Sequence, residues 1–410
     1  MNGKKCHWAL AAVNYKNNNR ITACPRGQLF LENKSNNFLP SKFFNNEEFK
    51  KLRLSLQQGD FPFHCRSCKE WEEKGLKSYR EEQNFNFWHE ELEKNFNSST
   101  GVSNFVNLEY LEFRFSNTCN FSCLHCMPEY SSSWAEIVRN HPPNENDKRY
   151  KIVQYEKDVP NQNWTIEEAE ELADDLIENF PSIKRIDFAG GEPLYQKQFW
   201  SFLRRFIKHP NVKNCSIVII SNFNTRVNYS ELANLLLNFK ESKVRISVDG
   251  GSRIYKYFRT GDWDKLNQNI DHFKSINKKT ILEATCTISA YQVLDLKNSI
   301  IDMFNLNVDR LHHTIVQYPT YLDPSVLKSR FLNAINHDLD DIENFLKGME
   351  YNYKIKTTLE IVDKLRKVYT SSTTNEEDYE RFCYYVERMD EIKKQNFDDC
   401  FPLTKNDLKC

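Results

Sequence analysis

The sequence lacks any hydrophobic run long enough to cross a membrane. Apolar runs such as 217–220 and 8–13 are far shorter than the roughly 20 residues that a spanning helix needs. Lys4 and Lys5 lie near the N-terminus, but the apolar stretch after them is shorter than the hydrophobic segment of a secretory signal peptide. We therefore expect a cytoplasmic protein that has no membrane partner.

The sequence also lacks an excess of charge of either sign. It has 56 Lys and Arg residues against 57 Asp and Glu residues, which gives a net charge of -1. Proteins that hold a nucleic-acid backbone usually carry a basic excess, so we expect no nucleic-acid partner. No tandem repeat of solenoid length is visible. With 40% hydrophobic and 13% aromatic residues, the chain still has ample material for a packed core.

At 410 residues the chain is longer than one average domain, and its composition divides it into three stretches. Residues 1–95 mix cysteines, aromatic residues and a charged helical pattern, and the polar run 95–101 marks their end. Residues 108–325 alternate strand-like and helix-like segments. Residues 326–410 have the apolar spacing of helices, with Glu and Lys on the exposed faces. We predict three regions with these boundaries.

The alternating middle region predicts the fold class. Six strand-like segments are separated in several places by amphipathic segments such as 165–180, which is typical of a parallel sheet in an α/β protein. The predicted strands are 111–115, 183–189, 216–220, 244–248, 282–288 and 311–316. About six βα units suit an open or closed barrel.

Twelve cysteines are the feature that composition leaves unexplained. In a reducing compartment disulfides rarely persist, and clustered thiols more often bind metal. Seven of the cysteines fall before residue 127: Cys6, Cys24, Cys65, Cys68, Cys119, Cys123 and Cys126. Five are scattered singly: Cys215, Cys286, Cys383, Cys400 and Cys410. We interpret Cys215 and Cys286 as core residues, with a hydrogen-atom donor as the alternative for Cys286, and the last three as exposed thiols.

Cys119, Cys123 and Cys126 form a C-x3-C-x2-C motif directly after the first predicted strand of the middle region. Three thiolates on one short loop can bind three irons of a 4Fe-4S cluster, which leaves the fourth iron open to a small molecule. The alternative is a zinc site, which prefers four protein ligands. His125 could be the fourth ligand only if it folded back between two cysteines.

This spacing after a first strand resembles the radical S-adenosylmethionine (SAM) superfamily, and the resemblance covers about residues 108–319. It implies a partial TIM-like barrel of six βα units, in which the open iron binds the amino and carboxylate groups of SAM. The reduced cluster then cleaves SAM to methionine and a 5'-deoxyadenosyl radical that abstracts hydrogen from an unactivated carbon. His125 matches a position that packs near the adenine. The resemblance also implies a flavodoxin- or ferredoxin-type electron donor.

A second motif supports the resemblance. Gly190, Gly191, Glu192 and Pro193 follow the second predicted strand of the middle region and resemble the GGEP motif of the family, whose backbone and glutamate meet the SAM amino group. Glycines allow a close approach of backbone to ligand, and a carboxylate accepts hydrogen bonds from an ammonium. The alternative for this motif alone is an ordinary turn.

Polar residues also follow the later strands, at the end where βα barrels place their active sites. By the resemblance, Arg259 pairs with the SAM carboxylate, and four strand-end residues approach the ribose and sulfonium: Ser221, Asn222, Ser247 and Asp249. The alternatives are ordinary loop capping for these four and a surface position for Arg259. Ser289 and Gln317 are further candidates for contacts with SAM or substrate.

Cys6, Cys24, Cys65 and Cys68 form a C-x17-C-x40-C-x2-C set, a spacing shared by zinc ribbons and fully ligated iron-sulfur clusters. The segments around them, together with residues 71–80, resemble the twitch or SPASM accessory modules of radical SAM enzymes. Such modules commonly follow the barrel, whereas this set precedes it. We favour a second 4Fe-4S cluster for electron transfer or structural support, with zinc as the alternative.

These patterns together predict a radical SAM enzyme that abstracts hydrogen from a substrate C–H bond. The leading substrate is a peptide or protein residue, and the alternative is a sugar or a nucleotide-derived small molecule. A hypothesis from another class is a non-catalytic scaffold with two zinc or iron-sulfur sites. That scaffold would need four protein ligands at both sites and would have no use for the motif 190–193.

Overall fold

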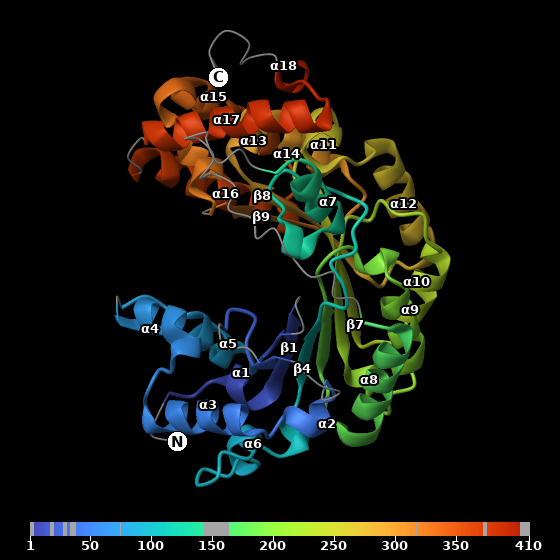
Figure 1. The fold of residues 1–410 in the computed structure, drawn as a ribbon. Helices are drawn as coiled ribbons and strands as arrows, with labels where there is room; N and C mark the ends of the chain where they lie inside the picture. The colour runs from blue at the N-terminus through green and yellow to red at the C-terminus, as the bar shows by residue number, and fades with distance from the viewer. Residues whose placement is uncertain are drawn as a thin grey trace. The chain divides into compact units, whose positions relative to one another are not determined.

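The computed structural model describes residues 4–16, 20–27, 31–32, 38–73, 75–142, 164–316, 318–371 and 375–401. The chain forms two compact units, each made of segments that are discontinuous in the sequence (Figure 1). The first unit holds residues 1–118, 160–219 and 234–242, and the second holds 119–159, 220–233 and 243–410. The division into the three regions predicted from composition stays a prediction.

The first unit is built on a sheet with the strand order β3-β2-β1-β4-β5-β6. Its strands are β1 (Ala12–Lys16), β2 (Arg20–Thr22), β3 (Leu31–Glu32), β4 (Tyr110–Phe113), β5 (Arg185–Phe188) and β6 (Ser216–Ser221), the last of which extends into the second unit. Strands β1, β4, β5 and β6 are parallel, and β2 and β3 pair antiparallel. Val13, Leu111, Ile186 and Ile217 lie side by side across the parallel strands and are at most 1% exposed.

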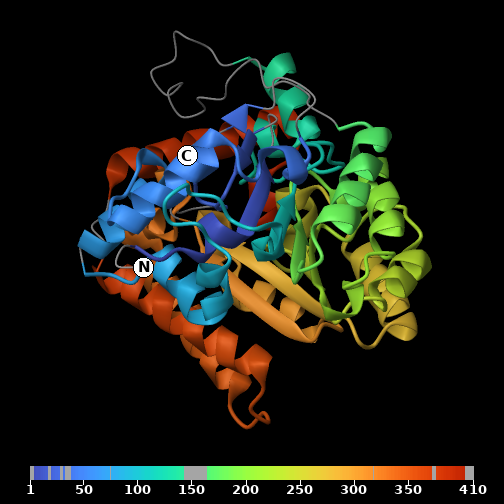
Figure 2. The same cartoon turned by 90° about the horizontal axis from the view of Figure 1, so that it is seen from below.

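Two long helices pack on each other and lie along one face of these strands (Figures 1 and 2). Helix α8 (Ile166–Asn179) begins at a capping box of Thr165 and Glu168, which confirms the amphipathic helix predicted at 165–180. Helix α9 (Lys197–Phe206) carries a stripe of buried aromatic residues, and its Phe202 ring lies 4.9 Å from the Phe113 ring of β4. Aromatic packing therefore fixes the helices to the sheet.

Shorter helices near the N-terminus complete the first unit. They are α1 (His7–Ala11), α2 (Pro40–Phe43), α3 (Glu47–Gln58), α4 (Arg66–Glu73), α5 (Tyr79–Phe87) and α6 (Glu90–Lys94). Arg53 of α3 is 2% exposed, and its guanidinium donates to the carbonyl oxygens of Ala9 and Phe44 at 2.8 Å each. One buried side chain thus ties α3 to α1 and to the segment after α2.

The second unit contains the parallel strands β7 (Glu241–Ser247), β8 (Ile281–Ile288) and β9 (Arg310–Ile315). Its helices are α7 (Ser132–Asn140), α10 (Tyr229–Leu236), α11 (Ser252–Arg259), α12 (Trp263–Ile276), α13 (Ala290–Val293), α14 (Leu296–Asn305), α15 (Lys328–Leu346), α16 (Tyr353–Ser371), α17 (Glu376–Lys393) and α18 (Phe397–Cys400); α10 and β7 each share a few residues with the first unit. At least one helix separates each of the strands β4 to β9 from the next. The predicted α/β class, with six βα units and a helical C-terminal region, is confirmed.

The N-terminal strands were not predicted from the sequence. The apolar run 8–13 extends over both α1 and β1, so it shows neither the helical nor the strand period cleanly.

The polar run 95–101 forms an ordered turn in which Asn97 Oδ1 accepts from the backbone N–H groups of Ser99 and Thr100 at 3.0 and 3.1 Å. A bridge between Phe96 and Ser103 closes this turn.

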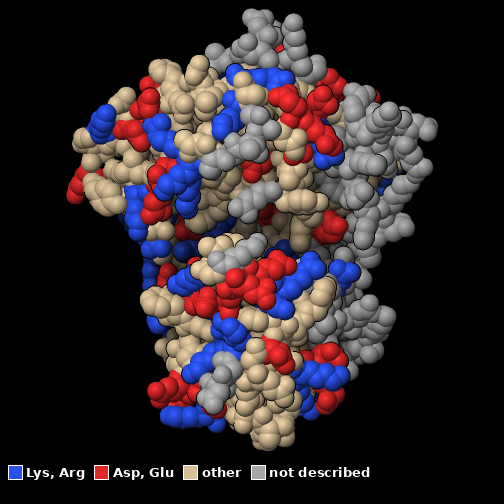
Figure 3. Space-filling view, turned by 90° about the vertical axis from the view of Figure 1, so that its left-hand side faces the viewer, with Lys and Arg blue, Asp and Glu red and all other residues tan. Residues whose placement is uncertain are grey.

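The surface carries both signs of charge, as the composition indicates. On the face shown in Figure 3, Lys and Arg side chains are interspersed with Asp and Glu. Within the described ranges, no helix is long and apolar enough to span a bilayer.

The singly placed cysteines are mostly buried. Cys215 and Cys286 are 0% and 3% exposed. The expectation of an exposed thiol is wrong for Cys383, which is 7% exposed because α17 turns it inward together with Phe382 and Val386. Cys400 is half-buried, and Cys410 lies outside the described residues.

His313 of β9 is a buried histidine without a polar partner. It pairs in register with Cys286 of β8, and among the described residues neither of its ring nitrogens has a hydrogen-bond partner. Burial, with smaller effects of His312 and Lys364, lowers the pKa of His313 to about 3. The folded protein therefore holds this ring neutral at pH values where an unfolded chain, with a histidine pKa of about 6.5, protonates it.

We predict that His313→Leu makes the protein less sensitive to acid. The unfolded state binds the extra proton as pH falls below about 6.5, so His313 costs the wild type about 2 kcal/mol of unfolding free energy between pH 7 and pH 5. Urea unfolding at both pH values measures this loss, which the variant should avoid. The control is His337→Gln, at a side chain that is 77% exposed. An equal loss of stability in wild type and His313→Leu would contradict the prediction.

Candidate functional site

Cys119, Cys123 and Cys126 lie on one loop between β4 and α7, at the start of the second unit. Cys123 is buried, and the other two are half-buried. Burial, and then the charge of the Cys123 thiolate, raises the pKa of the Cys126 thiol to about 12. The two sulfurs are therefore close enough to interact, and binding a metal here would release protons.

This loop has little backbone hydrogen bonding of its own, so side chains satisfy many of its carbonyl oxygens. Three of the donors lie at the start of α7: Ser133 Oγ bonds to Cys119 O at 2.8 Å, Ser131 Oγ to Phe121 O at 2.7 Å and Trp134 Nε1 to Cys123 O at 2.5 Å. Ser131 is also the N-cap of α7. The Ser-Ser-Ser-Trp run at 131–134, which begins five residues after Cys126, is a helix-start signal that sequence reasoning missed.

Two further donors come from α17, more than 250 residues later in the chain. The Tyr385 hydroxyl donates to Leu124 O at 2.5 Å, and the Lys393 ammonium donates to Ser122 O. No spacing in the sequence connects these residues with the cysteines. The C-terminal region, to which sequence analysis assigned no chemistry, therefore contributes to the cysteine loop.

Asp249 and Arg259 form a buried ion pair beside the loop. Asp249 follows β7 with a left-handed φ of 48°, and it also accepts from the Thr287 backbone N–H at 2.7 Å. Such a φ is strained for a residue other than glycine and persists only where surrounding contacts enforce it. Burial acts to lower the pKa of Arg259, but the negative charges of Cys123 and Asp249 outweigh it and raise that pKa.

His125 lies between the cysteines and this ion pair. Its ring stacks on Phe258 with centroids 5.0 Å apart, and its Nε2 is 3.7 Å from Asp249 Oδ2. Burial lowers the pKa of His125. His125 Nδ1 and Arg259 Nε are buried without a partner among the described residues. Two unmatched polar atoms beside three thiols are a suitable setting for a polar ligand.

The other strand-end residues of the second unit shape turns. Asn222 Nδ2 donates to Asn120 Oδ1 of the cysteine loop at 2.8 Å, so this residue does reach the loop. Ser221 Oγ accepts from the backbone N–H of Phe223, which has a left-handed φ of 53°. Ser247 is half-buried at the end of β7.

Of the two further candidates, the structure describes Ser289 alone. Ser289 is the N-cap of α13 in a capping box with Gln292, which is the ordinary capping role. Gln317 lies outside the described residues.

The segment 190–193 packs in the first unit against the residue that precedes Cys119. Gly191 has a φ of 58°, and a Cβ there would lie 2.4 Å from Thr118 O, so only glycine fits. The Glu192 backbone N–H donates to the same oxygen at 2.9 Å. The Glu192 carboxylate is 1% exposed and accepts from the Leu194 backbone N–H at 3.1 Å, just ahead of the buried Pro193 and Leu194. The motif thus sets the backbone at the entry to the cysteine loop.

The four N-terminal cysteines converge within the first unit. Cys6, Cys24, Cys65 and Cys68 line one cavity together with Trp8, Leu52, Leu56, His64 and Arg80. Burial and the neighbouring thiolates raise the pKa of Cys6 to about 11 and that of Cys24 to about 12. A zinc ion with Zn–S bonds of about 2.3 Å needs its sulfurs close together. Across the described part of the chain, no three His, Cys, Asp or Glu side chains are placed to hold one ion.

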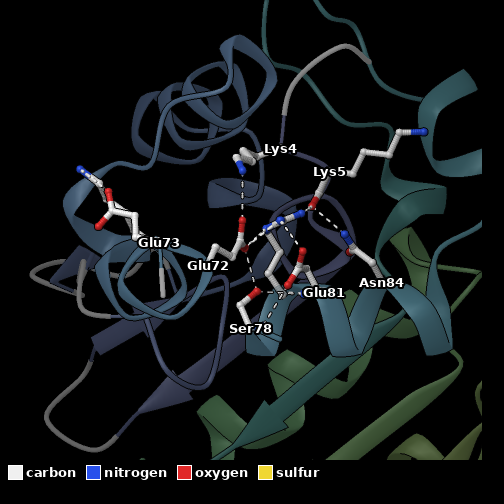
Figure 4. A network of polar contacts seen from close by, with 9 residues as sticks. Lys4, Lys5, Glu72, Glu73, Ser78, Glu81 and Asn84 are labelled. Atoms are coloured by element: carbon white, nitrogen blue, oxygen red, sulfur yellow. Dashed lines mark hydrogen bonds and ion pairs between the residues drawn. The ribbon is translucent and has the colours of Figure 1, made fainter. Parts of the chain in front are cut away.

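An ion-pair network connects the segment carrying Cys6 to the helix carrying Cys68 (Figure 4). Arg80 donates to Glu72 Oε1 of α4 at 2.7 Å and to Lys5 O at 2.5 Å. Lys4 Nζ reaches the other oxygen of Glu72 at 3.1 Å, and Ser78 Oγ donates to Glu72 Oε1 at 2.8 Å. Arg80 and Glu72 are each about 90% buried, so this network is well shielded from water.

Trp8, which lines the N-terminal cysteine cavity, belongs to a group of packed aromatic residues. Trp8 stacks on Tyr79 with centroids 5.6 Å apart and contacts Tyr110 edge-on at 4.6 Å. Cys6 and Cys24 pack against this group. Neither this group of aromatic residues nor Arg80 was identified as part of the site from the sequence.

Comparisons with known proteins agree with these observations. Residues 113–291 match the model of the Radical SAM superfamily. A relative named GTP 3',8-cyclase, from Thermodesulfovibrio yellowstonii, is 26% identical over 171 residues, which cover 41% of this chain and 44% of that protein. The chain thus spans less than half the length of this curated relative.

Solved structures give a weaker likeness. Native anSMEcpe with bound AdoMet is 16% identical, with 70% of this chain and 62% of that chain covered and a TM-score of 0.37. Streptococcus suis SuiB bound to precursor peptide SuiA is 14% identical, with 62% and 51% covered and the same TM-score. With TM-scores below 0.5, these likenesses do not bear on the reaction or the substrate.

We predict that Arg80→Met destabilises the first unit. The change removes the hydrogen bond that Arg80 donates to Lys5 O, and it leaves the buried Glu72 carboxylate with one fewer positive partner. Together these losses should lower the unfolding free energy by about 3 kcal/mol. Chemical denaturation followed by circular dichroism measures the loss. The control is Lys69→Met on the same helix as Glu72, because Lys69 is 51% exposed and should contribute little. Equal stability of the two variants would show that the network does not hold this region.

Proposed function

Because residues 113–291 form a domain of the Radical SAM superfamily, we propose that this enzyme holds a catalytic 4Fe-4S cluster on Cys119, Cys123 and Cys126 and binds SAM at its open iron. The observation that carries the proposal is the cysteine loop itself. It offers three thiols, beside which His125 Nδ1 and Arg259 Nε are buried without partners in the described ranges. The scaffold hypothesis instead needs a fourth protein ligand at this site.

Cluster and SAM together supply a one-electron cleavage that yields methionine and a 5'-deoxyadenosyl radical able to take hydrogen from a C–H bond. The chain's residues bind and orient. Arg259 offers its free Nε–H to a carboxylate while its Nη1 stays paired with Asp249. His125, held against Phe258, offers a ring face to an adenine.

The segment 190–193 would supply the remaining contacts with SAM. Its two glycines with left-handed φ bring backbone to the surface that a ligand can approach, and Glu192 supplies a carboxylate for an ammonium. Asn222, Ser221, Ser247 and Asp249 are proposed for the ribose side, with Asn222 supported by its bond to the loop residue Asn120.

We further propose that Cys6, Cys24, Cys65 and Cys68 hold a second 4Fe-4S cluster. The four thiols line a single cavity, and thiolates are the usual ligands of such a cluster. With four cysteine ligands this cluster would have no open iron, so it would transfer electrons or support the fold. Zinc is the alternative.

For the substrate, we propose a C–H bond of a peptide or protein residue, reached with electrons from a flavodoxin- or ferredoxin-type donor. The N-terminal cysteine set resembles accessory modules that accompany enzymes of peptide side chains, and such modules also accompany enzymes that act on sugars or cofactor precursors. A nucleotide-derived molecule is the second candidate, and the relative named GTP 3',8-cyclase favours it.

We predict that Cys126→Ala abolishes SAM cleavage. After anaerobic reconstitution, the wild type should form 5'-deoxyadenosine from SAM with a reductant, and the variant should form none because one iron loses its ligand. Liquid chromatography measures the product. Cys400→Ser, which changes a thiol of α18, should keep the wild-type rate. Bound iron with no SAM cleavage in the wild type would reject the proposed function.

We predict that Cys65→Ala removes only the N-terminal cluster. The iron content should fall by about four of roughly eight per chain, while the SAM-dependent spectral change of the catalytic cluster stays. Iron, zinc and sulfide analysis, with Cys400→Ser again as the control, measures the outcome. Zinc in the wild type that disappears in this variant would replace the proposed cluster with a zinc site.

A further inference from the structure

Helix α17 contacts the cysteine loop through two residues that lie eight positions apart along the helix. Tyr385 is 1% exposed, and its hydroxyl donates to Leu124 O at 2.5 Å. Lys393, at the C-terminal end of the helix, donates to Ser122 O. The two acceptors flank Cys123 directly, so α17 fixes the backbone on both sides of that cysteine.

The Lys393 ammonium also lies in a shielded setting. Its Nζ is 5.5 Å from the centre of the Trp134 ring, and Trp134 Nε1 bonds to Cys123 O at 2.5 Å. Burial lowers the pKa of Lys393 to about 8, against the opposing effect of the Cys123 and Cys126 charges. The side chain is therefore mostly cationic at neutral pH. In the described part of the chain, Lys393 forms no ion pair with a carboxylate.

A fixed positive charge beside an iron-sulfur cluster has a predictable effect. Reduction adds one negative charge to the cluster, and a nearby cation stabilises that charge more than it stabilises the oxidised state. Net charge, hydrogen bonding and solvent exposure are the properties by which proteins set cluster potentials. The effect of the cation on the potential is strongest where solvent screens the charge little, and the Trp134 ring excludes solvent on one side of Lys393.

We propose that Lys393 and Tyr385 are positioning residues of the catalytic cluster, and that the charge of Lys393 makes this cluster easier to reduce. The inference rests on the proposed cluster at Cys119, Cys123 and Cys126. It gives the C-terminal helical region a part in the electron-transfer step. The electron comes from the external reductant and passes through the cluster to SAM, and Lys393 keeps its proton.

The first test compares the cluster potential in Lys393→Met and Lys393→Arg. Anaerobic redox titration follows the electron paramagnetic resonance signal that changes on adding SAM, which separates the catalytic cluster from the N-terminal one. In Lys393→Met, the ratio of reduced to oxidised cluster at fixed potential should fall about tenfold, a shift of about 59 mV for one electron. Lys393→Arg keeps the charge and should keep the potential. Lys394→Gln is the control, since Lys394 is the exposed neighbour.

The second test measures how firmly the loop holds iron. Loss of one hydrogen bond to the loop, worth about 1 kcal/mol, should make iron removal by a chelator about fivefold faster in Tyr385→Phe and in Lys393→Met. Tyr384→Phe on the same helix is the control. Circular dichroism of each variant confirms that the helices remain folded.

The outcomes separate this inference from the proposed function. A wild type without any SAM-responsive cluster rejects the proposed function. A wild type with that cluster, together with an unchanged potential in Lys393→Met and unchanged iron loss in Tyr385→Phe, rejects the role of α17 alone. A lower potential in Lys393→Arg as well would show that packing, not charge, is responsible.

Discussion

An irregular loop that must keep its backbone polar groups paired is the constraint on which the site depends. The segment 119–126 forms neither helix nor strand, so its carbonyl oxygens need donors from elsewhere. Ser131, Ser133 and Trp134 supply three of them locally, and Tyr385 and Lys393 supply two from α17. The position of the thiols thus follows from hydrogen bonds to the backbone of this loop.

The two cysteine sets are held by different physical means. The loop of Cys119, Cys123 and Cys126 relies on neutral hydroxyl and indole donors and on one lysine. The N-terminal set relies on the buried pair of Arg80 and Glu72, which joins distant segments through charge. Both settings raise the pKa of their thiols by burial, as for Cys126 and Cys6. In both, the free energy gained on binding metal must offset the cost of removing those protons.

The sequence predicted most of the sheet, since strands β5 and β8 have apolar residues in a clear pattern between helical segments. It missed β1, because one apolar run is shared by a helix and a strand. Local motifs such as 190–193 could be found because a glycine in the sequence marks a backbone position that other residues do not fit, as Gly191 shows. Contacts made only by folding, such as Tyr385 on the loop or the inward turn of Cys383, have no sequence signature, because helix faces alone do not specify what they meet.

The pairing of β1 with β4 has a consequence for how the chain can be divided. Residues 12–14 form the parallel neighbour of 110–112. The segment between Cys6 and Cys24 therefore also supplies a strand of the sheet that precedes the loop of Cys119, Cys123 and Cys126. A fragment that began after residue 95 would expose the whole backbone edge of β4 on a strand whose residues are all buried here. Such an edge recruits strands from other chains. By pairing with β4, the N-terminal segment therefore also prevents that edge of the sheet from pairing with other chains.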